Sequence, residues 1–386
     1  MTARTRLIVL FVTAPVIAFA LVGGVMGKSM TRNETYQHLR VFEDVVSLIS
    51  SNYVEEADMA RVMRGAMRGL AEGLDSDSAY LSAEDVKAVE SGEKGLPGET
   101  GLELTRNYYL RVISARPNSP AERAGLRPGD FIRAINGKST REMSVFQGTR
   151  VLRGAPGTKV SLLVIRGNAA DPHTVDLVRE VPSGPDVTGR QEGKAGYIRI
   201  NNFGPGIAKA VASQAADLAR TGAAGLVLDV RGTATGALEN GLMAARLFVP
   251  AGTLAYKEVR GAERQPITAG GAGANDGSVK LPVVVLVNDG TSGASELFAA
   301  ALSGNGRAKL VGERTEGRVA MQKLVRLPDG TGMLISNAWY LTPAGAAIHE
   351  KGLTPTVAVE GPDVEFGAPA PTTDPILQKG LEALAK

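Results

Sequence analysis

One stretch, residues 283–322, constrains the fold more than any other. It begins with the apolar run Val283–Val287, which predicts a strand buried on both faces. A turn at Asn288–Gly290 and a run of small residues follow, and the apolar pattern of Leu297–Leu302 predicts a helix. A second short strand is predicted at Lys309–Val311. A strand that turns sharply into a helix exposes one side chain beside free helix N–H groups, which is typical of a nucleophile site.

Composition excludes several other kinds of site. The chain has 386 residues and is 44% hydrophobic, enough for two or three domains with ordinary cores. A formal net charge of +3 argues against a nucleic-acid partner. Without cysteine there is no thiolate nucleophile, disulfide or zinc-cysteine site. The three histidines, His38, His173 and His349, are too far apart in sequence to indicate a metal site, so no metal or cofactor is expected.

The N-terminal segment, residues 1–30, predicts contact with a membrane. Leu7–Met26 is an uncharged run of 20 residues, long enough to cross a bilayer, and Arg4 and Arg6 precede it. We expect a single-pass anchor in the inner (cytoplasmic) membrane, with the bulk of the protein in the periplasm. A cleaved signal peptide is the alternative, because Ala18–Ala20 has the A-x-A form.

The rest of the chain divides by its apolar periodicity. Residues 31–94 carry two helical apolar faces. Residues 182–360 alternate strands such as Gly225–Arg231 with helices such as Ile207–Leu218, which predicts an α/β core with crossover connections. Residues 361–386 are a Pro/Gly-rich linker followed by a short terminal helix over residues 376–384.

The stretch around the predicted strand-to-helix turn carries two longer patterns. The first, N-x-G-[ST]-A-S-A-S-E, is matched by Asn288, Gly290, Thr291, Ala294, Ser295 and Glu296. The second, G-[EK]-x-T-x-G-K-G-x-V-Q, is matched by Gly312, Glu313, Thr315, Gly317 and Gln322. The chain therefore resembles the carboxyl-terminal processing peptidases, or tail-specific proteases, which are PDZ-containing serine proteases with a Ser-Lys dyad.

The positions that carry the chemistry differ from that family. Gly293 stands where the resemblance places the serine nucleophile, and Arg318 where it places the lysine base. Glycine has no nucleophile, and arginine stays protonated near neutral pH, so neither supports the reaction. The retained Gln322, which orients the lysine in the family, is expected to be a leftover polar contact. Restoring Gly293→Ser with Arg318→Lys is expected to recover part of the cleavage.

The oxyanion loop is also altered. The family has N-N-x-G-G after the strand that ends near Arg231, whereas this chain has Gly232–Gly236 with only the last glycine kept. The resemblance assigns Gly236 and Ala294 to the oxyanion region, and Thr235 replaces a glycine there.

Residues 95–181 resemble a PDZ domain. Ser119–Asp130 matches the S-P-A-x-x-A-G-[LI]-x-x-G-D signature. The expected carboxylate-binding loop is Gly101, Leu102, Glu103 and Leu104, with the two leucines lining the pocket for a peptide's last side chain. Backbone N–H groups of such a loop hold a terminal carboxylate, and the neighbouring strand edge pairs with the peptide.

Two further expectations follow from the resemblance. Gly73–Leu81 is similar to the family's link G-L-D-P-H-S-x-Y-L, with Ser76 and Asp77 in place of Pro-His. N-terminal helices in the family often support dimer contacts, so a homodimer, or a hetero-assembly with an active paralogue or adaptor, is expected.

Two functions stay open. The first is a membrane-anchored, non-catalytic homologue that binds C-terminal peptides of exported proteins as a scaffold or regulator of proteolysis. The second is an active endopeptidase with a rearranged site in which Ser292 is the nucleophile. The nearby bases Lys309, Lys323 and Glu313 lack support from a motif. Arg318 is expected to pair with Glu296, Glu316 or a bound peptide carboxylate.

Overall fold

The computed structural model describes residues 36–92, 95–167, 171–270, 276–362, 364–366, 368 and 371–385. The chain divides into two compact units, residues 1–67 and 68–386. In the first unit, residues 36–52 are helical and α2 (Met59–Glu72) begins, as the apolar faces predict. The predicted anchor Leu7–Met26 lies outside the described residues. Of the helices that the structure describes, none is long and apolar enough to span a membrane.

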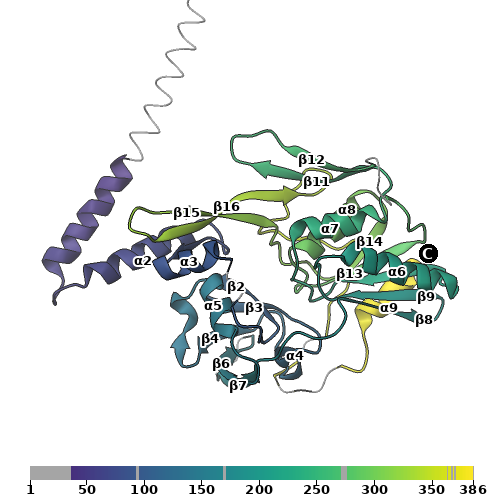
Figure 1. The fold of residues 1–386 in the computed structure, drawn as a ribbon, viewed down its shortest axis with the longest axis horizontal. Coiled ribbons are helices and arrows are strands. Elements are labelled where there is room, and N and C mark those ends of the chain that lie inside the picture. The colour runs from purple at the N-terminus through teal and green to yellow at the C-terminus, as the bar shows by residue number, and fades with distance from the viewer. Residues whose placement is uncertain are drawn as a thin grey trace, which may run out of the picture. The chain divides into compact units, whose positions relative to one another are not determined.

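The second unit contains a six-stranded sheet that holds the candidate site (Figure 1). Strands β9, β10, β13, β14 and β17 are parallel, and β8 is antiparallel to β9. The predicted alternation of strands with helices is confirmed. In order across the sheet the strands are β17 (Val357–Ala358), β14 (Ala308–Gly312), β13 (Val283–Val287), β10 (Gly225–Asp229), β9 (Ala195–Ile200) and β8 (Val187–Glu192).

Both faces of this sheet are covered by helices, so its central strands are apolar throughout. On β13, Val283, Val285 and Val287 pack in the core that includes Phe298 of α8, and Val284 packs with Ile376 of α9 on the other face. The terminal helix predicted from the sequence is therefore the second covering layer. The covering helices are α6 (Ile207–Arg220), α7 (Leu238–Arg246), α8 (Ala294–Gly304) and α9 (Pro375–Leu384).

A second, antiparallel sheet brings a distant segment to the site. Its strands are β1 (Ala79–Leu81), β11 (Gly252–Val259), β12 (Gln265–Ala269), β15 (Ala320–Arg326) and β16 (Gly332–Leu341). β1 pairs with β16, which also pairs with β15. This pairing places residues just before β1 next to β15, although about 240 positions separate them in sequence.

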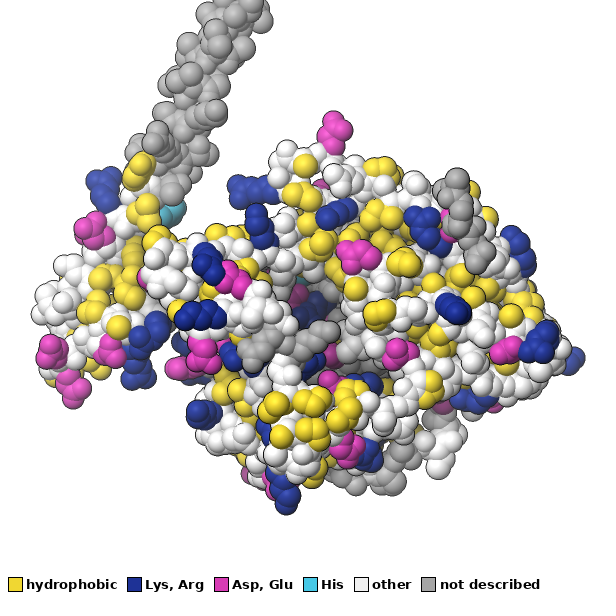
Figure 2. Space-filling model, viewed as in Figure 1, with side chains coloured by type: hydrophobic (Ala, Val, Ile, Leu, Met, Phe, Trp, Pro, Cys, Tyr) yellow, Lys and Arg dark blue, Asp and Glu magenta, His cyan; other side chains and the backbone are white. Residues whose placement is uncertain are grey.

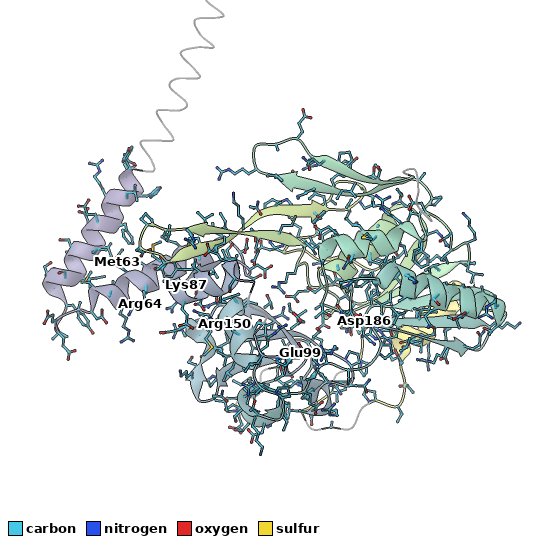
Figure 3. All side chains as sticks on the ribbon, viewed as in Figure 1. Met63, Arg64, Lys87, Glu99, Arg150 and Asp186 are labelled. Carbon is cyan, nitrogen blue, oxygen red and sulfur yellow. The ribbon has the colours of Figure 1, made fainter. Side chains whose placement is uncertain are left out.

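The third sheet forms what we call the β domain, the strands β2–β7 with α4 and α5. β2 is an edge strand that pairs only with β3 among the described strands, and α5 packs beside it. Arg150 of α5, labelled in Figure 3, pairs with Asp85 of α3 (Ala83–Glu90). The elements are β2 (Leu102–Asn107), β3 (Tyr109–Ala115), α4 (Pro120–Arg123), β4 (Phe131–Ile135), β5 (Lys138–Ser139), η1 (Thr140–Glu142), α5 (Val145–Leu152), β6 (Lys159–Ile165) and β7 (His173–Val178).

Charged side chains of both signs are interspersed on the visible face (Figure 2). This mixture agrees with the small net charge of +3.

Candidate active site

Gly293 forms the turn between β13 and α8. Its backbone angles are φ 68° and ψ −119°, a conformation that residues with a side chain rarely adopt. A Cβ built at this position would lie 3.6 Å from the carbonyl oxygen of Arg318 and 3.7 Å from Cδ2 of Leu238. A side chain at 293 therefore has room, and its cost would be backbone strain rather than a clash. The same distances bring positions 293 and 318 together, as the sequence patterns predict.

Glu296 connects the nucleophile loop to the loop that follows β14. Its carboxylate accepts hydrogen bonds from the amides of Gly293 (3.0 Å), Gly317 (2.7 Å) and Arg318 (2.8 Å), and from the Thr315 hydroxyl (2.5 Å). Complete burial raises the pKa of Glu296 to about 7, and these four hydrogen bonds oppose the rise. Because three of the four partners are amides that only donate, the geometry suits the ionised carboxylate. Glu296 thus holds both loops in the shape that a dyad would need.

The Arg318 side chain has a partner that the sequence did not predict. Its Nε donates to Oδ1 of Asp77 at 2.5 Å, and the two side chains are 25% and 3% exposed. Glu296 accepts from the backbone amide of Arg318 and not from its guanidinium group, and Glu316 pairs with Arg111 at 2.5 Å. The expected pairing of the Arg318 side chain with either glutamate is therefore wrong. One signal was present in the sequence, since both members of the pair depart from the family pattern and carry opposite charges.

This ion pair fixes the protonation of the site. Burial alone would lower the pKa of Arg318. The charge and hydrogen bond of Asp77, together with the charges of Glu103 and Glu316, hold that pKa above its usual value. Gln322 donates its side-chain amide to the Asp77 carbonyl oxygen, so it contacts the residue that binds Arg318. Burial also raises the pKa of Glu103 on β2 to about 7, although the positive charge of Arg318 acts in the opposite direction.

The oxyanion region is built around two close backbone contacts. Gly236 has φ 118°, and a Cβ there would lie 2.3 Å from the carbonyl oxygen of Phe203, so only glycine fits. Ala294 begins α8, where it lies against Gly241 of α7. The loop that contains Gly236 is bonded to the nucleophile loop through the carbonyl oxygen of Thr233.

The serines beside Gly293 point into the protein. Ser292 is 2% exposed, and its amide donates to the carbonyl oxygen of Thr233 at 3.0 Å. Ser295 is fully buried, and its hydroxyl donates to the same oxygen at 2.6 Å. Of the candidate bases, Lys309 and Lys323 are exposed. The carboxylate of Glu313, the third candidate, accepts the amide of Gly361 at 2.5 Å.

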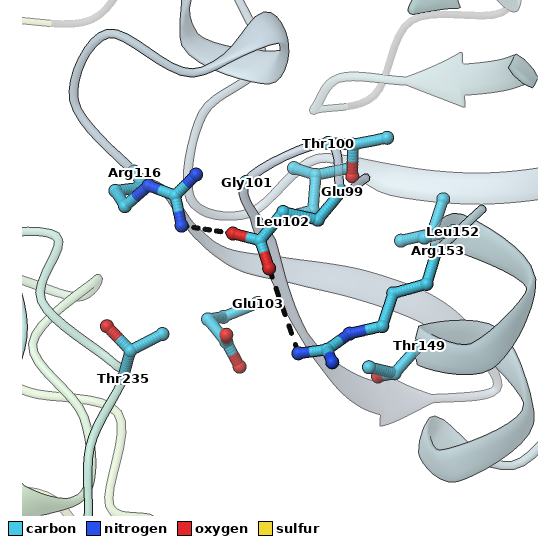
Figure 4. Close-up of a pocket in the computed structure, with 10 residues that line it drawn as sticks. All are labelled: Glu99, Thr100, Gly101, Leu102, Glu103, Arg116, Thr149, Leu152, Arg153 and Thr235. Atoms are coloured by element: carbon cyan, nitrogen blue, oxygen red, sulfur yellow. Dashed lines mark hydrogen bonds and ion pairs between the residues drawn. The ribbon is translucent and has the colours of Figure 1, made fainter. Parts of the chain in front are cut away.

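The expected peptide-binding loop lies at the border of the β domain. Gly101 has φ 82°, and a Cβ there would lie 2.1 Å from Cβ of Ser119, so this position also requires glycine. Leu102 and Glu103 line a small cavity of about 30 Å³ together with Thr235 of the oxyanion loop (Figure 4). Leu104 is 1% exposed and packs in the core of the β domain. The described residues contain no cluster of three or more His, Cys, Asp or Glu arranged to hold a metal ion.

Two family descriptions match this chain. Peptidase family S41 matches residues 194–359, which contain most of the α/β core and both loops of the site. A PDZ domain matches residues 111–166, within the β domain. The expected resemblance to PDZ-containing carboxyl-terminal processing peptidases is therefore confirmed at the level of the family.

Whole-chain comparisons agree with these matches. The chain is 37% identical to a carboxyl-terminal-processing protease of Synechocystis sp., over 74% of this chain and 67% of that protein. It is 32% identical to the carboxy-terminal processing protease CtpA of Bacillus subtilis, over 82% of this chain and 67% of that protein. The solved structure of a photosystem II D1 C-terminal processing protease superposes with a TM-score of 0.68 at 28% identity, covering 83% of this chain and 92% of that chain.

Proposed function

The chain belongs to peptidase family S41, and on that premise we propose that it is a non-catalytic member that binds the C-termini of exported proteins. In this role it acts as a scaffold or regulator of proteolysis. The observation that carries the proposal is the ion pair of Arg318 with Asp77 beside Gly293, in the place where a Ser-Lys dyad would act.

The chemistry of this arrangement disfavours peptide hydrolysis. Position 293 offers no oxygen to attack a carbonyl carbon. Arg318, held protonated by Asp77, has no free electron pair to accept a proton. The same site keeps its supporting geometry, because Glu296 still bonds both loops. The loops thus keep their geometry while the reactive groups are missing, which is consistent with a binding or regulatory role.

The alternative is cleavage with Ser292 as the nucleophile. It is supported by the relatives, which are named as proteases. Against it, Ser292 is 2% exposed, and none of Lys309, Lys323 and Glu313 is bonded to it. Use of Ser292 would need the loop before α8 to shift its register.

Peptide binding is supported by the shape of the β domain. The unpaired edge of β2 lies beside α5, which is the geometry for adding a peptide strand. The loop around Gly101, at the end of that edge, packs closely against Ser119. We assign C-terminal peptides as the ligand class on this basis.

Two further parts of the proposal concern location and assembly. The uncharged run Leu7–Met26 supports a single-pass anchor in the inner membrane with the bulk of the protein in the periplasm. On the helix over residues 36–52, Val41, Val45 and Leu48 are 47–60% exposed, and such an apolar face supports a homodimer or an assembly with a paralogue.

A direct assay separates the two candidate functions. The purified full-length chain and its Ser292→Ala variant are incubated with fluorescein-labelled casein and, separately, with a fluorophosphonate probe for serine hydrolases. The proposal expects no casein cleavage and no labelling of either protein. Cleavage by the wild type that Ser292→Ala abolishes would replace the non-catalytic proposal with the active-protease alternative.

Protease treatment of spheroplasts tests the proposed membrane topology, since residues beyond Lys28 should be degraded.

A further inference from the structure

Two arginines of the β domain converge on one internal carboxylate (Figure 4). Nη1 of Arg116 donates to Oε1 of Glu99, and Nη2 of Arg153 lies 3.7 Å from Oε2 of the same side chain. Figure 3 labels Glu99 near the border between the β domain and the core. The Glu99 side chain is 21% exposed, so solvent only partly screens these interactions.

The backbones that carry these side chains are fixed. The amide and carbonyl groups of Glu99 exchange two 3.0 Å hydrogen bonds with those of Glu180. The amide of Arg116 donates to the carbonyl oxygen of Gly101 at 2.8 Å, which joins Arg116 directly to the expected peptide-binding loop. Arg153 is the C-terminal cap of α5. Only a change of side-chain rotamer is therefore needed to separate Glu99 from the two guanidinium groups.

The cavity next to this cluster is nearly filled in the present conformation. Glu99, Arg116 and Arg153 line it together with Gly101 and Leu102. Its volume of about 30 Å³ holds one or two water molecules but not a carboxylate with a side chain. A peptide C-terminus consequently enters only if a group that now fills the site leaves it.

We infer that Arg116 and Arg153 are the carboxylate subsite for a peptide's C-terminus, and that Glu99 occupies this subsite when no peptide is bound. The inference rests on the proposed peptide binding and adds the residues that control it. A terminal carboxylate and a glutamate carboxylate have the same charge and the same two acceptor oxygens, so one replaces the other on the arginines. Release of Glu99 into solvent balances the charge that the peptide brings in.

A second carboxylate nearby makes coexistence unfavourable. Glu103 of β2 lines the same cavity as Glu99, and the negative charge of Glu99 contributes to the raised pKa of Glu103. A peptide carboxylate added while Glu99 is still in place would meet two acidic side chains and already paired arginines. A peptide carboxylate therefore binds by displacing Glu99 from the two arginines. Glu99 weakens peptide binding, and it favours ligands that carry a free carboxylate over ligands that do not.

The test measures affinity by fluorescence anisotropy with the full-length chain. The probes are fluorescein-labelled hexapeptides whose last residue is varied over the apolar amino acids, each prepared with a free carboxylate and as the C-terminal amide. Glu99→Gln keeps the size of the side chain and removes its charge. It should tighten binding of the free-carboxylate peptides by about tenfold, the scale of one charge-assisted hydrogen bond, and leave the amides unchanged. Adding Arg116→Gln to this variant should reverse the gain.

Glu180→Gln is the matched control. Glu180 also pairs with an arginine of the β domain, Arg123, at 2.5 Å, but it does not line the cavity. This variant should bind every probe as the wild type does. Circular dichroism melts confirm that each variant is folded.

The possible results are distinguishable. If the wild type binds free carboxylates and Glu99→Gln binds them no more tightly, the inference is wrong and the proposed peptide binding stands. If Glu99→Gln tightens binding of amides equally, the gain comes from opening the cavity, and the arginine subsite is refuted. If neither protein binds any probe, the proposed peptide binding fails, and the inference fails with it.

Discussion

The ion pair at the candidate site leads to a specific prediction about restoring catalysis. The obvious revertant, Gly293→Ser with Arg318→Lys, replaces both residues that depart from the dyad. The sequence alone predicts that this revertant recovers part of the cleavage. With Asp77 in place we expect it to stay almost inactive near pH 7.5, because Asp77 would keep the new lysine protonated. Adding Asp77→Asn should remove that restraint and recover cleavage.

The size of the effect follows from the geometry. Nε of Arg318 lies 2.5 Å from Oδ1 of Asp77, and the amine of a lysine at 318 would be one bond further along the side chain. At a separation of roughly 4 Å and an effective dielectric constant of about 20, the attraction is about 4 kcal/mol. This raises the lysine pKa by about 3 units and lowers the fraction of neutral amine near neutral pH by about 10³. Screening is limited because the Asp77 side chain is 3% exposed.

The assay compares initial rates on fluorescein-labelled casein from pH 6 to pH 10. The triple variant should cleave at least about 100-fold faster than the double variant at pH 7.5. Both rates should rise with pH. Their ratio should narrow only above the pKa of the triple variant's lysine, where that amine is already neutral while the amine of the double variant is still losing its proton. Arg318→Lys with Asp77→Asn, in which Gly293 is kept, is the matched control and should not cleave.

Two outcomes would refute this reasoning. Equal rates of the double and triple variants at pH 7.5 would show that Asp77 does not set the protonation of residue 318. A triple variant that melts like the wild type, reacts with a fluorophosphonate probe and still does not cleave would place the defect elsewhere. The oxyanion loop is then the next region to restore, since one lost donor costs about 2.7–4 kcal/mol.

Three further predictions concern stability. The pKa of Glu103 is raised from 4.5 to about 7 in the folded protein, so the folded state binds this proton more tightly and the free energy of unfolding falls as the pH rises from about 4.5 to 7. Glu103→Gln should flatten that fall in thermal melts, and an unchanged slope would contradict the assignment. Gly293→Ala should lower the free energy of unfolding by about 1–3 kcal/mol in urea titrations because of the positive φ, and a neutral result would mean that the turn relaxes. Asp374 pairs with Arg231 at 2.7 Å but is 39% exposed, so Asp374→Asn should cost only about 1 kcal/mol and increase hydrogen exchange in α9; protection equal to the wild type would exclude this role.

Much of the core was predictable from sequence because its signals are local. The apolar run Val283–Val287 is strand β13 with the bounds that the pattern gives. The terminal helix was predicted over residues 376–384 and is observed as α9, Pro375–Leu384. Positions 293 and 318 were paired through motif spacing, and they are neighbours in the structure, because a Cβ built at Gly293 would lie 3.6 Å from the Arg318 carbonyl oxygen.

The partners of the site residues were not predictable, because they depend on long-range pairing. Asp77 reaches Arg318 only because β1 pairs with β16, and no periodicity near residue 77 signals that contact. The role of Glu99 is similar, since its two arginines come from separate elements of the β domain. Motif matching also assigned Leu104 to a pocket, whereas the observed register of β2, with an irregularity after Glu103, buries it in the core.

The departures from the family pattern at positions 77 and 318 are one physical change rather than two. Asp77 is nearly buried, and without Arg318 its charge would be uncompensated, which typically costs 3–5 kcal/mol. Arg318 in turn depends on Asp77, because burial alone would lower its pKa. Each residue therefore stabilises the presence of the other, and a single reversion of either one is unfavourable. A site held in this way keeps the two loops bonded through Glu296 while residue 318 stays protonated, and this geometry is the basis of the proposed non-catalytic role.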